Sequence, residues 1–166
     1  MFQGDAFMKA AVLREVGKPL LIEDVQINKP GPHEVLVRTA AAGVCHSDLH
    51  FVEGSYPFPL PAVIGHESAG VVEAVGSEVR TVKVGDHVIT CLSVFCGHCE
   101  FCLSGHMSIC QTPEVKMPPG AAKRLRWNGR PIITTPPKPG WMRSTVEQPS
   151  QLSVLLPPRC ARHRLN

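Results

Sequence analysis

The sequence predicts a mainly β fold, a barrel or a sandwich of short strands. Short apolar runs that contain β-branched residues recur along the first 110 residues, and glycines and prolines separate them. Almost no segment has the 3.6-residue periodicity of an amphipathic helix. Hydrophobic residues make up 43% of the 166 residues and charged residues 19%, which favours a packed core over global disorder.

The predicted strands follow one another between turn residues. The first apolar run is at 10–13, and an imperfect alternation follows at 20–25. The Lys-Pro-Gly-Pro segment at 29–32 predicts a turn, because proline fixes φ and glycine permits positive φ. A short helical turn is expected after Ser47, whose hydroxyl can accept a hydrogen bond from a free helix N–H. Further strands are expected at 34–40, 71–75 and 86–90.

The C-terminal part of the chain differs in composition from the rest. Residues 1–115 contain 7 Lys and Arg against 13 Asp and Glu, whereas residues 116–166 contain 10 against 1. Prolines increase from seven in the longer part to nine in the shorter part. No aromatic interleaving or recognition helix accompanies the positive charge, so we expect a solvated tail and no nucleic-acid partner.

Residues 130–166 are expected to have little order. The proline-rich run at 131–140 is predicted to form neither a helix nor a central strand, because proline lacks the backbone donor that both require. The abrupt change in charge and proline content is also typical of an out-of-frame or truncated reading frame. We therefore expect a disordered or out-of-frame tail over residues 130–166.

The sequence contains no run of 18 apolar residues, so no membrane-spanning helix and no membrane partner are predicted. The N-terminus lacks a basic region followed by an apolar one, which predicts no secretory signal and makes the cytoplasm the expected compartment.

Six of the seven cysteines fall between residues 45 and 110. In a cytoplasmic chain, clustered cysteines indicate metal binding more than disulfides.

The last four of these cysteines have the spacing of a structural zinc site. Their pattern is C-x2-C-x2-C-x7-C, and four thiolates complete a tetrahedral shell at roughly 2.3 Å per Zn–S bond, without a position for substrate. Such a metal stabilises a loop that has too few apolar side chains to fold alone. An iron–sulfur centre and a disulfide pair are the alternatives. The four residues are Cys96, Cys99, Cys102 and Cys110.

A second group of metal-capable residues lies at the ends of two predicted strands. Cys45 follows one strand and His66 precedes another, and a thiolate and an imidazole are both good zinc ligands. Asp48 and Glu67 can act from outside the ligand shell by fixing the tautomer of His66. A catalytic zinc requires three protein ligands and one open position, so two convincing ligands plus Glu67 form an incomplete set. A small buried cysteine and a hydrogen-bonded structural histidine are the alternative interpretation.

Five motifs in this order resemble the N-terminal, GroES-like half of the zinc-dependent medium-chain alcohol dehydrogenases, a family of oxidoreductases. The resemblance covers roughly residues 8–129, with 1–7 as an N-terminal extension and 91–112 as a structural zinc lobe. It implies a partly open GroES-like β-barrel that carries this lobe. The motifs are MKAAVL at 8–13, GVCHSD at 43–48, GHESAG at 65–70, KVGDHV at 83–88 and the four-cysteine pattern.

The resemblance implies two zinc sites. Cys45 and His66 match ligands of the catalytic zinc, and Glu67 lies beside this metal and coordinates it transiently during water exchange. Asp48 supports the same zinc shell. In this family the metal acts as a Lewis acid toward the alcohol oxygen. The structural zinc is expected on Cys96, Cys99, Cys102 and Cys110.

The resemblance also implies a proton path and a cofactor contact. Ser47 is the hydroxyl that takes the alcohol's proton, and His50 continues the path toward solvent, since an imidazole titrates near neutral pH. His46 occupies a position that contacts the phosphate of NAD or NADP. The implied reaction is hydride transfer between a small alcohol or aldehyde and this cofactor, in a family whose members form homo-oligomers.

The sequence departs from the family in three respects. The third catalytic ligand, usually a cysteine after the lobe, has no match, because the only later cysteine, Cys160, lies in unrelated sequence. No G-x-G-x-x-G turn of a Rossmann domain occurs in the chain, and the strands that close the barrel after the lobe are expected to be missing. We therefore expect the isolated chain to bind zinc without catalysing alcohol oxidation. A non-catalytic zinc-binding module and a GroES-like interaction module are the alternative functions.

Overall fold

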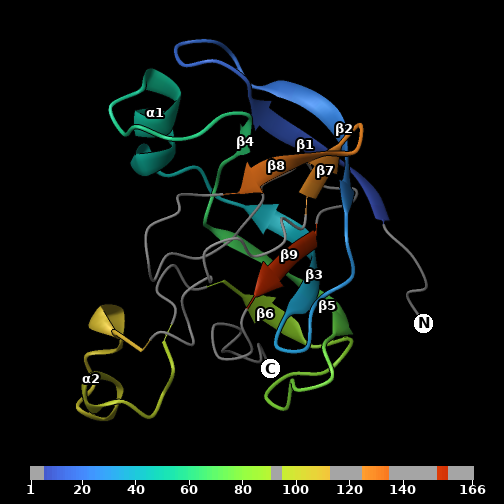
Figure 1. Ribbon diagram of the computed structural model, residues 1–166. Coiled ribbons are helices and arrows are strands. Elements are labelled where there is room, and N and C mark those ends of the chain that lie inside the picture. Colours follow the sequence, from blue (N-terminus) through green and yellow to red (C-terminus); the bar gives the residue numbers. More distant parts are fainter. Residues whose placement is uncertain (1–5, 91–94, 113–124, 135–152, 157–166) are drawn as a thin grey trace.

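Two β-sheets and three short helices form the part of the chain that the computed structural model describes, which is residues 6–90, 95–112, 125–134 and 153–156 (Figure 1). One sheet closes into a barrel whose strands are, in spatial order, β1 (Ala6–Leu13), β2 (Leu21–Ile27), β7 (Leu125–Trp127), β8 (Arg130–Thr134) and β4 (Ala62–Val63). The other sheet contains β6 (His87–Ile89), β5 (Ser68–Val75), β3 (Val35–Ala42) and β9 (Ser153–Leu156).

Paired strands are antiparallel throughout, except that β4 and β8 are parallel. The apolar runs that the sequence predicts as strands correspond to β1, β2, β3, β5 and β6, which confirms the mainly β fold. β1 begins at Ala6, so it includes two residues of the expected N-terminal extension. Within the described residues, no helix has the length and apolar character that crossing a membrane would need.

Side chains of both sheets share one apolar core. Alternate residues of β1 from Met8 to Val12 are buried, because successive side chains of a strand point to opposite faces. β3 instead buries three consecutive residues, 35–37, and its register against β5 shifts between Leu36 and Val37. A smaller cluster attaches helix α1 (His46–Glu53) to the barrel through Leu13, Phe51, Ala62 and Ile64.

The first five residues of the expected tail, 130–134, form a strand, because β7 and β8 make a hairpin around Asn128 and Gly129. The φ angles of these residues, 47° and 75°, are those of a two-residue turn with positive φ at both central positions. Asn-Gly between strand-forming residues is a strong hairpin signal, and the prolines that follow it obscured the signal. The closing strands that were expected to be missing are therefore present, and β9 adds a further strand beside β3.

Pro131 lies inside β8 without interrupting the ladder. It stands opposite Arg126, one position beyond the pair that closes the hairpin. Antiparallel pairs alternate between hydrogen-bonded and non-hydrogen-bonded, so no N–H is required toward β7 at this position. β4 pairs with β8 only at Ile133 and Thr134, after the proline. The remaining residues of the expected tail, 135–152 and 157–166, lie outside the described part of the chain.

Replacing Ile132 tests whether β8 belongs to the core. Its side chain is 1% exposed, so Ile132→Ala should lower the free energy of unfolding by about 2–5 kcal/mol through lost burial and a residual cavity. Ile22→Ala, at a side chain that is 61% exposed, is the matched control and should change it by less than about 0.5 kcal/mol. Urea unfolding measures both changes, and equally small effects would show that β8 does not pack in the core.

Candidate metal centres and active site

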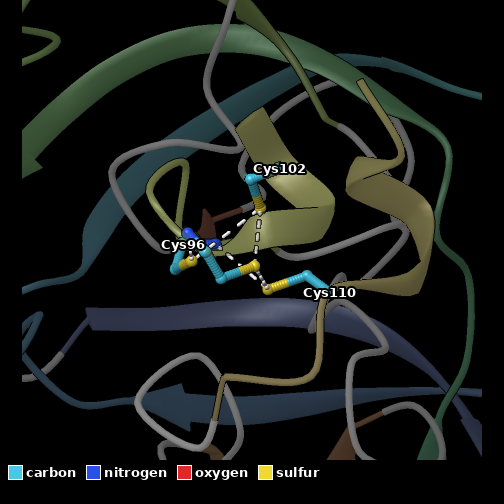
Figure 2. A group of neighbouring side chains, drawn as sticks. Cys96, Cys102 and Cys110 are labelled. Carbon is cyan, nitrogen blue, oxygen red and sulfur yellow. Dashed lines mark hydrogen bonds between the residues drawn. The ribbon is translucent and has the colours of Figure 1, made fainter. Parts of the chain in front are cut away.

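The four cysteines predicted from their spacing converge in a lobe that contains helix α2 (Glu100–Leu103) and the 3-10 helix η1 (Met107–Ile109). In Figure 1 this lobe lies apart from the two sheets. Figure 2 shows the sulfurs of Cys96, Cys102 and Cys110 turned toward one another. Cys99 is the first residue before α2 and Cys102 lies one turn later, so both sulfurs face the same side.

The distances between the sulfurs match the geometry of one tetrahedral ion. The Sγ atom of Cys102 is 3.8 Å from that of Cys96 and 3.5 Å from that of Cys99, and Cys99 and Cys110 are 3.8 Å apart. A tetrahedron with Zn–S bonds of roughly 2.3 Å has edges of about 3.8 Å. The four residues therefore fit a single zinc ion.

The alternatives to zinc fit this geometry less well. All five cysteines of the described residues are free thiols, so no disulfide pair is present among them. A multi-iron cluster lies between its ligands and would hold the sulfurs farther apart than one ion does. The close set of four thiols thus favours a single tetrahedral metal over the two alternatives that the spacing left open.

Hydrogen-bond donors surround the sulfur of Cys96. The backbone N–H groups of Cys99 and His98 lie 3.2 and 3.5 Å from it, and the hydroxyl of Thr112 lies 3.1 Å away. Burial opposes ionisation of Cys96, yet these donors outweigh burial and lower its pKa to about 5. Thr112 has no metal-site signal in the sequence, because its contact spans 16 residues.

The pKa of Cys102 shifts in the opposite direction to that of Cys96. Burial, together with hydrogen bonds to the three neighbouring sulfurs, raises the pKa of Cys102 to about 11. The metal-free cluster at neutral pH therefore combines a thiolate at Cys96 with a bound proton at Cys102. Zinc must displace the remaining protons, so its affinity for this cluster should increase with pH.

The second predicted group also assembles. The candidate ligand atoms of Cys45, His66 and Glu67 all lie within 4.8 Å of one another. Cys45 directly precedes α1, whereas His66 and Glu67 lie in the short segment between β4 and β5. His66 is buried and Glu67 is exposed, so the group is open to solvent on the carboxylate side. One sulfur, one imidazole and one carboxylate are a donor set that fits zinc.

Asp48 connects the cysteine and the histidine of this group. One carboxylate oxygen accepts a hydrogen bond of 2.9 Å from the backbone N–H of Cys45. The other, Oδ1, faces Nδ1 of His66 at 3.5 Å. Asp48 is itself buried, so its carboxylate is fixed between the start of α1 and the imidazole. This arrangement leaves Nε2 of His66 as the nitrogen available to a metal.

Gly43 leaves the space that the carboxylate of Glu67 occupies. A Cβ atom built at Gly43 would lie 2.3 Å from Oε2 of Glu67 and 3.1 Å from its Cβ. The backbone N–H of Gly43 also donates a 2.9 Å hydrogen bond to the carbonyl of Glu67. Glycine at this position therefore allows β3 and the Glu67 segment to approach closely.

The remaining predicted residues lie on α1. The hydroxyl of Ser47 is 3.6 Å from the sulfur of Cys45. Nδ1 of His50 is buried and has no hydrogen-bond partner among the described residues. The ring of His50 contacts that of His46 at 4.5 Å and that of Tyr56 at 5.0 Å. The hydroxyl of Ser47 thus lies beside Cys45, and His50 lies against His46 and Tyr56 on the same helix. Cys160 lies outside the described residues.

Removing the hydroxyl of Thr112 tests whether its hydrogen bond stabilises the thiolate of Cys96. Thr112→Val deletes a donor to Cys96, so its thiolate should become less stable and the protons should compete better with zinc. The midpoint pH of zinc release should then rise by about 0.5 unit, measured with a chromophoric zinc indicator during acid titration. Ser108→Ala, at an exposed residue of η1, is the control and should leave the midpoint unchanged. An unchanged midpoint for Thr112→Val would contradict this role.

Comparisons with known proteins identify the family of the domain. The family model of the alcohol dehydrogenase GroES-like domain matches residues 31–157. The geraniol dehydrogenase of Castellaniella defragrans is 54% identical over 102 residues, which cover 61% of this chain and 27% of that protein. The chain thus spans about a quarter of the length of this curated relative.

Solved structures give the same result. An alcohol dehydrogenase zinc-binding domain protein from Burkholderia ambifaria is 42% identical with a TM-score of 0.67, over 78% of this chain and 36% of that one. A zinc-binding dehydrogenase from Sinorhizobium meliloti, bound to NADP, is 29% identical with a TM-score of 0.60, over 95% and 38%. Because the family model covers most of the chain, this protein belongs to the alcohol dehydrogenase GroES-like domain family.

Proposed function

We propose that this chain carries the metal-binding and substrate-contacting part of a zinc-dependent, NAD(P)-linked alcohol dehydrogenase. The reaction is the interconversion of a small alcohol with an aldehyde or ketone by hydride transfer. The convergence of Cys45, His66 and Glu67 beside the hydroxyl of Ser47 is the observation that carries the proposal. The family of its relatives supports the same reaction class.

In this proposal Cys45 and His66 hold the catalytic metal. When bound, zinc supplies Lewis-acid polarisation of the alcohol oxygen. The buried carboxylate of Asp48 fixes the ring orientation of His66 through Nδ1. The exposed carboxylate of Glu67 is close enough to serve as an exchangeable third donor, because Gly43 leaves room for it.

Ser47 and His50 form the proposed proton path. Ser47 lies beside the sulfur of Cys45, where its hydroxyl can accept the proton of an alcohol. Nδ1 of His50 is buried and has no hydrogen-bond partner among the described residues, and an imidazole can accept a proton on one nitrogen and donate one from the other. The exposed His46 is the proposed contact for a phosphate of NAD or NADP.

The four-cysteine cluster is proposed to hold a structural zinc. The buried apolar cluster of the lobe consists of Phe95, Cys96 and Cys110, with Cys99 and Cys102 packed against them. Few hydrocarbon side chains are therefore available to stabilise this part of the chain. Four metal–sulfur bonds would supply the missing free energy of folding.

A second candidate function is zinc binding without catalysis. The four-sulfur set is complete, whereas the group at Cys45 contains two convincing ligands and one exposed carboxylate. The chain also contains no G-x-G-x-x-G turn that would hold a dinucleotide. We therefore propose that the isolated 166-residue chain binds zinc but does not oxidise alcohols. The free thiols of the described residues fit a reducing compartment, and we propose the cytoplasm. We also propose that the protein forms homo-oligomers, as members of the family do.

Zinc stoichiometry separates the two metal centres. We expect one tightly held zinc per chain, and Cys102→Ser should abolish it, because three sulfurs leave the shell incomplete. Cys45→Ser is the matched control and should retain the tight zinc while losing a second, weakly held one. Elemental analysis before and after dialysis measures both. A tight zinc that survives Cys102→Ser would contradict the structural site.

An activity assay tests the second candidate directly. The purified chain, supplied with zinc, a primary alcohol and either NAD or NADP, should give no cofactor reduction above the rate without protein. Absorbance at the wavelength of the reduced nicotinamide measures this rate. Cofactor reduction that depends on the chain and disappears with Cys45→Ser would overturn the proposal of zinc binding without catalysis.

A further inference from the structure

The residue that directly follows β6, Thr90, bridges the two peptide groups on either side of Glu67. Its hydroxyl lies 3.2 Å from the carbonyl oxygen of His66 and donates to it. The same hydroxyl oxygen accepts a 3.0 Å hydrogen bond from the backbone N–H of Ser68. One side chain therefore satisfies an acceptor and a donor in the segment that carries the proposed ligands.

Backbone contacts reinforce this bridge. The N–H of Thr90 donates to the carbonyl of Ser68 at 2.9 Å, next to the paired residues Ala69 and Ile89. The last backbone pair between β5 and β6 therefore lies beside the hydroxyl. The side chain of Thr90 extends the bonding of this edge toward His66, beyond the reach of the backbone ladder.

The opposite edge of the same segment has its own contact. The N–H of Gly43, just after β3, donates to the carbonyl of Glu67. Successive carbonyls of an extended chain point to opposite edges, so Gly43 holds one carbonyl and Thr90 holds the preceding one. The segment of His66 and Glu67 is thus held from both sides, at the carbonyl of His66 by Thr90 and at the carbonyl of Glu67 by Gly43.

We propose that Thr90 is a positioning residue for the metal ligand His66. Its hydroxyl fixes the backbone from which the imidazole extends toward Cys45 and Glu67. Without the hydroxyl, the carbonyl of His66 and the N–H of Ser68 lose their partner, and the segment becomes free to move relative to Cys45. This inference rests on the proposed function, because it takes His66 as a ligand of the catalytic metal.

Cobalt binding to the full chain tests this role without relying on activity. Co²⁺ is added as the probe, and the absorbance that depends on Cys45 is obtained by subtracting the titration of Cys45→Ser. Thr90→Val keeps the shape of the side chain and removes the hydroxyl, so its dissociation constant at this site should rise by about tenfold. Cobalt bound to the four-cysteine cluster should be unchanged.

Two control variants separate positioning from general stability. Thr90→Ser restores the hydroxyl and should bind cobalt as the wild type does. Thr39→Val removes a hydroxyl from another buried threonine, one whose oxygen has no hydrogen-bond partner among the described residues, and should also bind normally. Unchanged binding by Thr90→Val, or an equal loss with Thr39→Val, would overturn the proposal.

Two measurements on the wild-type chain separate failure of this inference from failure of the proposed function. If it shows no absorbance that depends on Cys45, the proposed function fails, and this inference fails with it. If that absorbance is present but Thr90→Val does not fold, hydrogen exchange of the Ser68 amide decides. The bond to the Thr90 hydroxyl should slow this exchange at least tenfold relative to an unprotected amide. Unprotected exchange of Ser68 would overturn the positioning role while leaving the proposed metal ligands in place.

Discussion

The antiparallel pairing of β3 with β5 determines where the reactive side chains meet. Ala42 at the end of β3 stands opposite Ser68 at the start of β5, so the residues beyond this pair leave the sheet at one place. Cys45 follows from one strand and His66 precedes the other, although 21 positions separate them in the chain. A shift of one residue in this register would exchange the two faces of the strand and separate the ligands. The chemistry of the site therefore depends on the alignment of two strands.

Local signals predicted much of the fold, and what they missed has two causes, one local and one non-local. Five strands were found because their apolar runs are bounded by turn residues, which act within a few positions. The hairpin of β7 and β8 was missed although Asn128-Gly129 is a typical hairpin turn sequence. The prolines that follow it suggested that no strand forms there. The two residues of β4 and their parallel pairing with β8 have no signal in a short window, since their partners lie about 70 residues away.

The same distinction applies to the metal centres. The four cysteines of the lobe lie within 15 residues, so their spacing was sufficient to predict that they converge. The positions of Cys45 and His66 at two strand ends left their pairing open, and the resemblance was needed to infer it, because spacing alone does not show that two loops meet. The hydroxyls of Thr112 and Thr90 had no signal in the sequence. Each acts through one hydrogen bond or two to residues 16 to 24 positions away.

The parallel contact between β4 and β8 has a consequence for synthesis on the ribosome. The barrel closes only when Ile133 and Thr134 pair with Ala62 and Val63, so it cannot close until residue 134 has emerged from the ribosome. The sulfur and imidazole groups from Cys45 to Cys110 all leave the exit tunnel earlier. During that interval the thiols of the nascent chain have emerged although the barrel is still open. Closing the barrel is slow, because β4 and β8 are far apart in the sequence. Metal capture can therefore precede completion of the barrel during translation.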